Sequence, residues 1–225
     1  MSQPRMLKGI MTVGFWTLLS RVLGMAREVL IFALIGAGPV LDAFIAAFRL
    51  PNMFRRFFAE GAFNAAFVPM FSKRLEADDR PSQFASQAMG GLATVLLILT
   101  GLAMIFMPAL VWATAEGFTG TDRFELTVDY GRIMFPYILL ISLAALLSGA
   151  LNASGRFAMA AAAPVFLNIL IIAALCIAYV TGYDAIWFLV WTVPIAGIVQ
   201  LALVWYASQK AGLNITLGRP RWNSE

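Results

Sequence analysis

The sequence contains no histidine and a single cysteine, Cys176, among its 225 residues. The absence of histidine excludes histidine-based catalytic triads and histidine metal ligands, and a single cysteine excludes an internal disulfide and cysteine-rich metal sites. No G-x-x-x-x-G-K-[ST] loop for binding nucleotide phosphates occurs, so transport by this chain would draw its energy from a gradient or a partner. No nucleophile–base pair is visible either. We therefore expect neither an enzyme nor a protein that carries a metal or cofactor.

Charged residues are also scarce, since they make up only 12% of the chain. A soluble domain has roughly 25% charged residues. Hydrophobic residues reach 61%, and the mean hydropathy is +0.82. These values indicate an integral membrane protein. In a soluble protein the net charge of +4 would point to a nucleic-acid partner. Here the position of the cations explains it better, and we expect no nucleic acid.

Six apolar stretches are long enough to cross a bilayer, which takes about 20 mostly apolar residues per helix. They lie at residues 10–35, 40–71, 85–113, 133–153, 157–180 and 185–207. We therefore predict an all-α membrane protein with one six-helix lobe over residues 1–210, followed by a cytoplasmic linker over 211–225 that leads towards a further part. Within the second stretch, Pro51 removes a backbone hydrogen bond and is predicted to kink or break the helix at 50–52.

The distribution of lysine and arginine between the two sets of span ends predicts the orientation. One set carries nine cations, Arg5, Lys8, Lys73, Arg74, Arg80, Arg156, Lys210, Arg219 and Arg221. The other set carries only two, Arg123 and Arg132. Because cytoplasmic loops hold the excess of lysine and arginine, both termini are predicted to be cytoplasmic.

The remaining five cations are all arginines, and they lie inside the first two apolar stretches together with three acids. The arginines are Arg21, Arg27, Arg49, Arg55 and Arg56, and the acids are Glu28, Asp42 and Glu60. A cation near the bilayer centre costs at least about 2.5–3.5 kcal/mol on insertion scales, and such residues usually face a water-filled cavity. Five cations against three acids leave an excess of positive charge. The pattern predicts a cationic cavity for an anionic ligand.

Spacing indicates which of these side chains share a helix face. Arg21 and Glu28 are seven residues apart, as are Asp42 and Arg49, and this spacing returns to nearly the same face of a helix. A guanidinium offers planar, bidentate donors that match phosphate, so several of them could hold a diphosphate. Two structural alternatives stay open: Arg55 and Arg56 could snorkel to the interface, or Arg27 and Glu28 could pair within a packed bundle.

Other polar residues of the apolar stretches are predicted to serve packing. Asn168 and Gln200 are expected to form hydrogen bonds between helices rather than to bind a ligand. Ser148, Gly149 and Asn152 have the small or polar side chains typical of close helix contacts.

Several short motifs in the first two stretches resemble the sequence signature of a known protein family. Residues 20–28, SRVLGMARE, resemble the first-helix signature S-R-x-L-G-x-x-R-[DE] of the MurJ (MviN) lipid II flippases. The second-helix signature of this family resembles DAF at 42–44, RLPN at 49–52, RR at 55–56, FAEGAF at 58–63 and AFVP at 66–69. The match is dense over residues 17–71 and weaker beyond.

The resemblance implies a fold and a function. The family belongs to the multidrug/oligosaccharidyl-lipid/polysaccharide exporter superfamily and has two six-helix lobes plus two further helices, so this chain is similar to the N-terminal lobe. Members move the lipid-linked peptidoglycan precursor, lipid II, from the cytoplasmic to the periplasmic leaflet of the bacterial inner membrane for cell-wall synthesis. Implied partners are lipid II, membrane lipids, the second lobe and the cell-wall synthesis machinery.

The resemblance also implies functional positions. The positions important in the family correspond to Arg21, Arg27, Glu28, Asp42 and Arg55, with glutamate at 28 where the family often has aspartate. We expect alternating access, with bends at Gly24 and Pro51. Arg21, Arg27 and Arg55 are expected to bind the diphosphate of the headgroup, and Glu28 to pair with a neighbouring arginine when the site is empty.

Two other functions are considered beside the flippase. A gradient-coupled exporter of small drugs would need acids that attract cations, and the embedded charge has the opposite sign. A membrane scaffold that transports nothing predicts that the embedded arginines tolerate substitution.

Overall fold

The structure, a computed structural model, describes residues 3–56 and 62–218, and its regular elements there are all helical. In chain order they are α1 (Gln3–Ile35), α2 (Pro39–Arg55), α3 (Ala62–Glu76), α4 (Pro81–Ile105), α5 (Met107–Thr114), the 3-10 helix η2 (Glu116–Phe118), α6 (Asp122–Met134), α7 (Tyr137–Ala153), α8 (Ala158–Thr181) and α9 (Ala185–Lys210).

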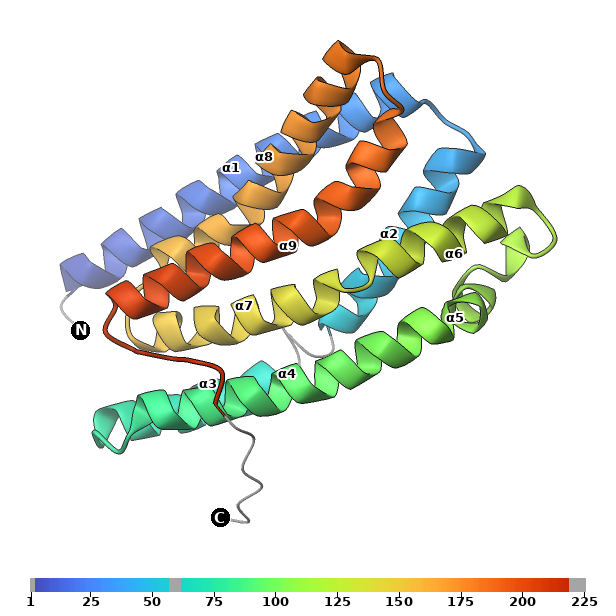
Figure 1. Ribbon diagram of the computed structural model, residues 1–225. Helices are drawn as coiled ribbons and strands as arrows, with labels where there is room; N and C mark the ends of the chain where they lie inside the picture. Colours follow the sequence, from blue (N-terminus) through green and yellow to red (C-terminus); the bar gives the residue numbers. More distant parts are fainter. Residues whose placement is uncertain (1–2, 57–61, 219–225) are drawn as a thin grey trace.

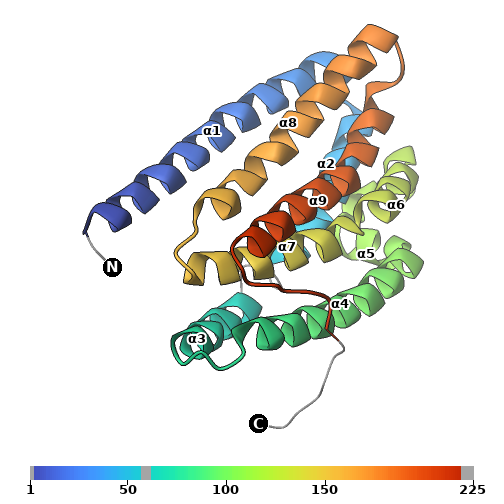
Figure 2. The same ribbon diagram turned by 60° about the vertical axis from the view of Figure 1, so that its left-hand side comes forward.

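The long helices lie side by side in an elongated bundle (Figures 1 and 2). Helix α8 packs between α1 and α9, α9 packs on α7, and α7 contacts α3 and α4, while α2 packs on α6. The start of α1, the α7–α8 turn and the end of α9 lie at one end of the bundle, and the α1–α2 and α8–α9 turns lie at the other (Figure 1). We call the first of these the terminal end.

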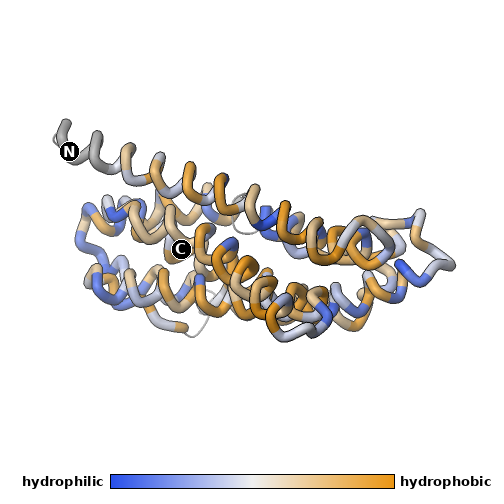
Figure 3. The backbone as a smooth tube through the Cα atoms, turned by 90° about the horizontal axis from the view of Figure 1, so that it is seen from above, coloured by the Kyte–Doolittle hydropathy of each residue, from blue (hydrophilic) through white to orange (hydrophobic). Residues whose placement is uncertain are grey.

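Apolar side chains cover much of the outside of this bundle as well as its core. Leu97, Ile105 and Val180 are 62%, 68% and 82% exposed. Such exposure is expected when the surrounding medium is lipid rather than water. Hydrophobic residues run along the helices, and hydrophilic residues gather mainly near the two ends (Figure 3). The protein is therefore a multi-pass membrane protein, and the regular structure of residues 3–56 and 62–218 is helical.

Three described helices are long and apolar enough to cross a membrane by themselves, namely α4, α8 and α9. Helices α6 and α7 pass the same test as a pair that is bent by 41°, which gives up to four spans. The apolar stretches predicted at 157–180 and 185–207 correspond closely to α8 and α9. The first predicted stretch, 10–35, lies within α1, and the stretch at 40–71 corresponds to α2 and α3 with residues 57–61 outside the described part.

Prolines explain where two of the predicted stretches are divided. Pro108 has no N–H to donate to the carbonyl of Met104, four residues earlier, so the helix is interrupted between α4 and α5 at Phe106. Arg132 Nε of α6 donates to that Met104 carbonyl at 3.3 Å. In the same way Pro136 has no N–H to donate to the carbonyl of Arg132, and the bend between α6 and α7 lies at this proline.

Pro51 does not break the helix, which was one of the two predicted outcomes. Helix α2 continues through the buried Pro51 and ends at Arg55. The side chain of Asn52 donates to the carbonyl of Phe48 at 3.0 Å, which adds a bond beside the one that Pro51 cannot make.

The chain after α9 folds back onto α4. Ile215 and Leu213 are buried, and the carbonyl of Ile215 accepts from Trp205 Nε1 at 3.1 Å and from Gln209 Nε2 at 2.7 Å. The N–H of Thr216 donates to Ser86 Oγ at 3.0 Å. Residues 213–218 therefore form a strap that joins α9 to α4, and they lie within the stretch 211–225 that was predicted to be a linker.

Candidate anion site between helices α1 and α2

A cavity of about 380 Å³ lies between α1 and α2 and brings together two of the embedded arginines. Its polar lining is Arg27 and Glu28 from α1 and Arg49 and Asn52 from α2. Its other walls are apolar, among them Ile31, Phe32, Leu41, Phe44, Ile45, Phe48 and Ile171. We call this cavity the α1–α2 groove. The described lining holds two arginines and one glutamate, so it carries a net positive charge.

Arg27 is held in this groove from the side of α8. Its NH1 donates to Asn168 Oδ1 at 3.0 Å, and Asn168 Nδ2 donates to the carbonyl of Ser20 at 3.0 Å. Asn168 is 5% exposed, and the Arg27 side chain is 19% exposed. The Nε of Arg27 is buried and has no hydrogen-bond partner in residues 3–56 and 62–218. The guanidinium is therefore fixed in place, and the remaining N–H groups of NH1 and NH2 can donate to a ligand.

Glu28 forms a weak contact with the same arginine. Its Oε1 lies 3.3 Å from Arg27 NH2, and the Glu28 side chain is 66% exposed. An exposed ion pair of this kind contributes about 0–1 kcal/mol, because water screens the attraction. An anion can therefore take the place of the carboxylate at little cost.

Asp42 and Arg49 lie at a second cavity, on another side of α2. This cavity has a volume of about 670 Å³ and extends from α2 to Thr114, Ala115 and Phe118. Asp42 Oδ2 is 3.1 Å from Arg123 NH1 of α6, so this acid joins two helices rather than facing the α1–α2 groove. Among the described lining residues only Ile45 and Arg49 are shared by both cavities.

The remaining predicted site residues are not gathered in the groove. Arg21 and Arg56 are exposed and Arg55 is half-buried near the end of α2, and none of the three is among the described residues that line either cavity. Glu60 lies outside the described residues. The structure thus unites Arg27, Glu28 and Arg49, whereas the seven-residue spacing of Arg21 and Glu28 does not place both in the groove.

The predicted hinge positions have different surroundings. A Cβ at Gly24 would meet Asn168 Nδ2 at 3.7 Å, an ordinary van der Waals distance, so close packing does not require a glycine there. Pro51 is buried inside α2. In the described ranges no group of three or more acids or cysteines could hold a metal ion.

The polar residues predicted to join helices do so. Asn168 joins α8 to α1, and Gln200 of α9 donates to the carbonyl of Ala163 at 2.7 Å. A Cβ at Gly149 would meet Val68 Cγ2 at 3.1 Å, which confirms its role in close packing. What the sequence did not reveal is that Asn168 also binds Arg27. An asparagine within the apolar run 158–181 is the signal that could have suggested a buried charged partner.

Comparison with known proteins identifies similar sequences. The family described as "Lipid II flippase MurJ" matches residues 31–225. The chain is 47% identical over 224 residues to the "Probable lipid II flippase MurJ" of Rhizobium tropici, with 96% of this chain and 42% of that protein covered. It is 40% identical over 196 residues to the "Lipid II flippase MurJ" of Burkholderia cenocepacia, with 86% and 38% covered. The chain therefore spans less than half of the length of these relatives.

Solved structures give the same picture of the fold. A structure described as "Lipid II flippase MurJ, inward closed conformation" superimposes with a TM-score of 0.72 at 26% identity, covering 88% of this chain and 42% of that one. An outward-facing multidrug resistance transporter of the MATE family in the MOP superfamily has a TM-score of 0.72 at 16% identity, covering 96% and 48%. The second likeness concerns the fold alone.

Proposed function

Since this chain belongs to the MurJ family of lipid II flippases, we propose that it forms the N-terminal lobe of such a flippase. In this proposal the complete protein moves the lipid-linked peptidoglycan precursor from the cytoplasmic to the periplasmic leaflet by alternating access. The family is one of transporters rather than of catalytic enzymes.

The α1–α2 groove carries the proposal for the substrate. Arg27, Arg49 and one acid, Glu28, line this cavity of about 380 Å³, whose other walls are apolar. Guanidinium groups bind phosphate oxygens through charge-assisted, bidentate hydrogen bonds. We assign the diphosphate of lipid II to these two arginines, with the polyprenyl chain remaining in lipid. Arg21, Arg55 and Arg56 would contact other parts of the headgroup when the lobes close.

An exchange of partners at Arg27, between Glu28 and the diphosphate, provides a way to bind and release the substrate. In the structure Glu28 lies 3.3 Å from Arg27 NH2 and is largely exposed. A diphosphate would displace this carboxylate, and Glu28 would take its place again after release. Asn168 keeps the guanidinium in position in both states, because its hydrogen bond uses NH1 from the side of α8.

The membrane placement that goes with this function has six spans. Helices α1, α8 and α9 each cross once, while α2 with α3, α4 with α5, and α6 with α7 each form one bent or interrupted span. Both termini would be on the cytoplasmic side of the bacterial inner membrane, since Arg156 and Lys210 lie at the terminal end of the bundle. Gly24 and Pro51 would permit the bends that open one side and close the other.

The proposed partners follow from the same function. A second lobe of the same protein would complete the cavity, and membrane lipids would surround the exposed apolar faces. The machinery of cell-wall synthesis would supply and consume the transported precursor.

Binding of lipid II by the purified chain tests the proposal. Native mass spectrometry in detergent would compare lipid II with an uncharged polyprenol, for the wild type and for Arg27→Gln and Arg49→Gln. Lys73→Gln is the matched control, because Lys73 is an exposed cation at the end of α3 that is not among the described lining residues.

We expect binding that needs the diphosphate, falls about tenfold or more in each groove variant, and is unchanged in Lys73→Gln. Equal binding of polyprenol, or groove variants that bind as the wild type does, would refute the assignment. Should the folded wild-type chain show no binding, the test would be repeated with the full-length protein.

A further inference from the structure

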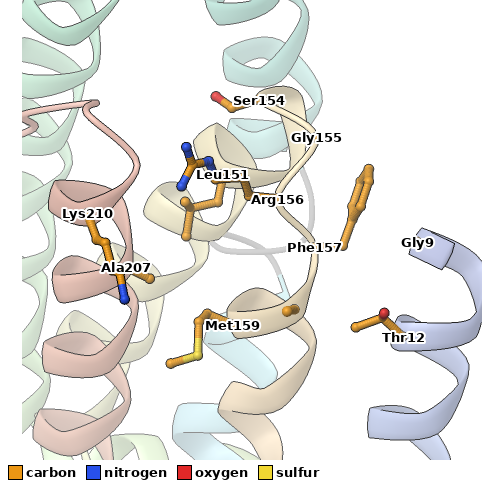
Figure 4. A pocket seen from close by; sticks show the side chains of 11 residues that line it. Gly9, Thr12, Leu151, Ser154, Gly155, Arg156, Phe157, Met159, Ala207 and Lys210 are labelled. Carbon is orange, nitrogen blue, oxygen red and sulfur yellow. The ribbon is translucent and has the colours of Figure 1, made fainter. Parts of the chain in front are cut away.

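A larger cavity lies at the terminal end of the bundle, away from the α1–α2 groove. Its volume is about 760 Å³, and its walls come from α1, the α7–α8 turn and the last turn of α9. Two cations line it: Arg156 from the turn and Lys210, the last residue of α9. Figure 4 shows Arg156 extending from the turn towards α9, which carries Lys210. We call this the turn cavity.

The charge of the turn cavity is not neutralised. Its described lining contains no acid. Neither Arg156 nor Lys210 forms an ion pair or a side-chain hydrogen bond within the described ranges, in contrast to Arg74, which pairs with Asp79 at 3.0 Å. Two free cations beside one cavity favour an anionic occupant.

The rest of the turn cavity is largely apolar. Leu151, Phe157 and Met159 contribute to its walls. Phe157 is turned towards α1 (Figure 4), where a Cβ at Gly9 would come within 3.2 Å of its ring. The glycine thus lets the aromatic wall lie close to α1. Near the start of α1, Met11 and Phe15 are 66% and 61% exposed.

Cations above apolar walls match an amphiphile better than a free ion. Arg156 and Lys210 are both exposed, so salt and water weaken their attraction for a soluble anion. A lipid that carries a phosphate gains from the same two cations and from burial of its apolar part, and it is already concentrated in the bilayer. Basic pockets between helices at the membrane boundary have this chemistry.

We propose that the turn cavity binds an anionic glycerophospholipid of the leaflet at the terminal end. Its phosphate lies between Arg156 and Lys210, and its apolar part lies against Leu151, Phe157 and Met159.

This site is distinct from the α1–α2 groove. Thr12, which lines the turn cavity, precedes Arg27 by fifteen residues on α1, or roughly 22 Å at 1.5 Å per residue. The proposal uses the membrane location of the chain but does not depend on lipid II being its substrate.

Lipid retention by the purified chain tests this site. Native mass spectrometry would compare phosphatidylglycerol, which is anionic, with phosphatidylcholine, which carries a phosphate but no net charge, and with glycerol 1-phosphate, which has no acyl chains. The variants are Arg156→Gln, Lys210→Gln and the double variant. Lys73→Gln removes a cation at the same end that is not part of the described lining. Exposed substitutions of this kind change stability little, and thermal unfolding verifies that each variant is folded.

We expect a preference for phosphatidylglycerol that falls about fivefold for each cation removed and persists in Lys73→Gln. Equal losses in Lys73→Gln would mean that diffuse surface charge holds the lipid, which overturns the proposal. It is also overturned if both single variants keep the preference, or if glycerol 1-phosphate binds as tightly as the lipid. Lipid II binding, measured separately with Arg27→Gln, keeps a failure here distinct from a failure of the proposed function.

Discussion

Replacing Asn168 with leucine removes the side chain that holds Arg27 against α8 but keeps a side chain of similar size. Asn168 accepts from Arg27 NH1 at 3.0 Å and donates to the carbonyl of Ser20 at 3.0 Å. A hydrogen bond to a charged group contributes roughly 1.5–3 kcal/mol in soluble proteins, and bonds between membrane helices average about 0.6 kcal/mol. We expect Asn168→Leu to lower the free energy of unfolding by about 2 kcal/mol. We also expect about tenfold weaker lipid II binding, because the guanidinium is no longer held in position.

Gln200→Leu provides the matched control, since it also removes a buried amide that joins helices. Gln200 is 1% exposed, donates to the carbonyl of Ala163 at 2.7 Å and accepts from the hydroxyl of Tyr137 at 3.2 Å. It is not among the described residues of the α1–α2 groove. Its loss should lower the free energy of unfolding by about 1–2 kcal/mol and leave the affinity for lipid II unchanged.

Two assays separate the effects of these variants. Thermal unfolding in detergent reports stability, and a shift of about 2–4 °C is expected for each kcal/mol in a chain of this size. Titration with lipid II, followed by native mass spectrometry, reports affinity. Equal weakening of lipid II binding by both variants would show that Asn168 acts only through stability. An unchanged affinity in Asn168→Leu would show that Arg27 needs no support from α8, and either result refutes the reasoning.

Two further predictions concern contacts that join helices. A Cβ at Gly90 would overlap the carbonyl oxygen of Gly218, whereas a Cβ at the neighbouring Gly91 meets nothing within 4 Å. We therefore expect Gly90→Ala to release the strap and Gly91→Ala to leave it in place. The rate of proteolysis within residues 213–218 measures this release. The Asp42 and Arg123 side chains are 42% and 41% exposed, so a double-mutant cycle on thermal unfolding should give a coupling of only about 0.2–1 kcal/mol. A coupling above about 2 kcal/mol would contradict this view of a weak, easily opened pair.

Long helices made mostly of apolar residues were the easiest to predict. The predicted stretches 157–180 and 185–207 differ little from α8 and α9, because an apolar run of that length has few other stable states in a bilayer. Local signals also mark the turn between them: Gly182 ends α8 with a φ of 71°, and Asp184 caps α9 by accepting from the N–H of Ile186 at 3.2 Å. Such end signals act within a few residues and can be read from the sequence.

Interrupted helices were harder to predict, because the effect of a proline on a helix depends on partners that are distant in sequence. Pro108 divides α4 from α5, and Arg132 of another helix bonds the carbonyl that this proline leaves open. Pro51, by contrast, lies inside the continuous α2. The same residue type therefore gives two results, and the presence of a proline alone does not distinguish them.

The candidate site could likewise be predicted only in part from the sequence. The embedded arginines were evident from the sequence, since a cation in an apolar stretch needs a polar environment. Which of them share a cavity was not evident, because spacing gives the face of one helix but not the helix that packs on it. Helix α8 holds Arg27 through Asn168, and α6 holds Asp42 through Arg123 at 3.1 Å.

Photo-crosslinking most directly tests whether the α1–α2 groove is the headgroup site. A lipid II analogue with a photoreactive group beside its diphosphate would be activated on the purified chain, and the labelled peptides would be sequenced. We expect labels on the peptides that contain Arg27 and Arg49, and we expect unmodified lipid II to compete these labels away. Labels confined to α4, α5 or the α7–α8 turn, with α1 and α2 unlabelled, would contradict it.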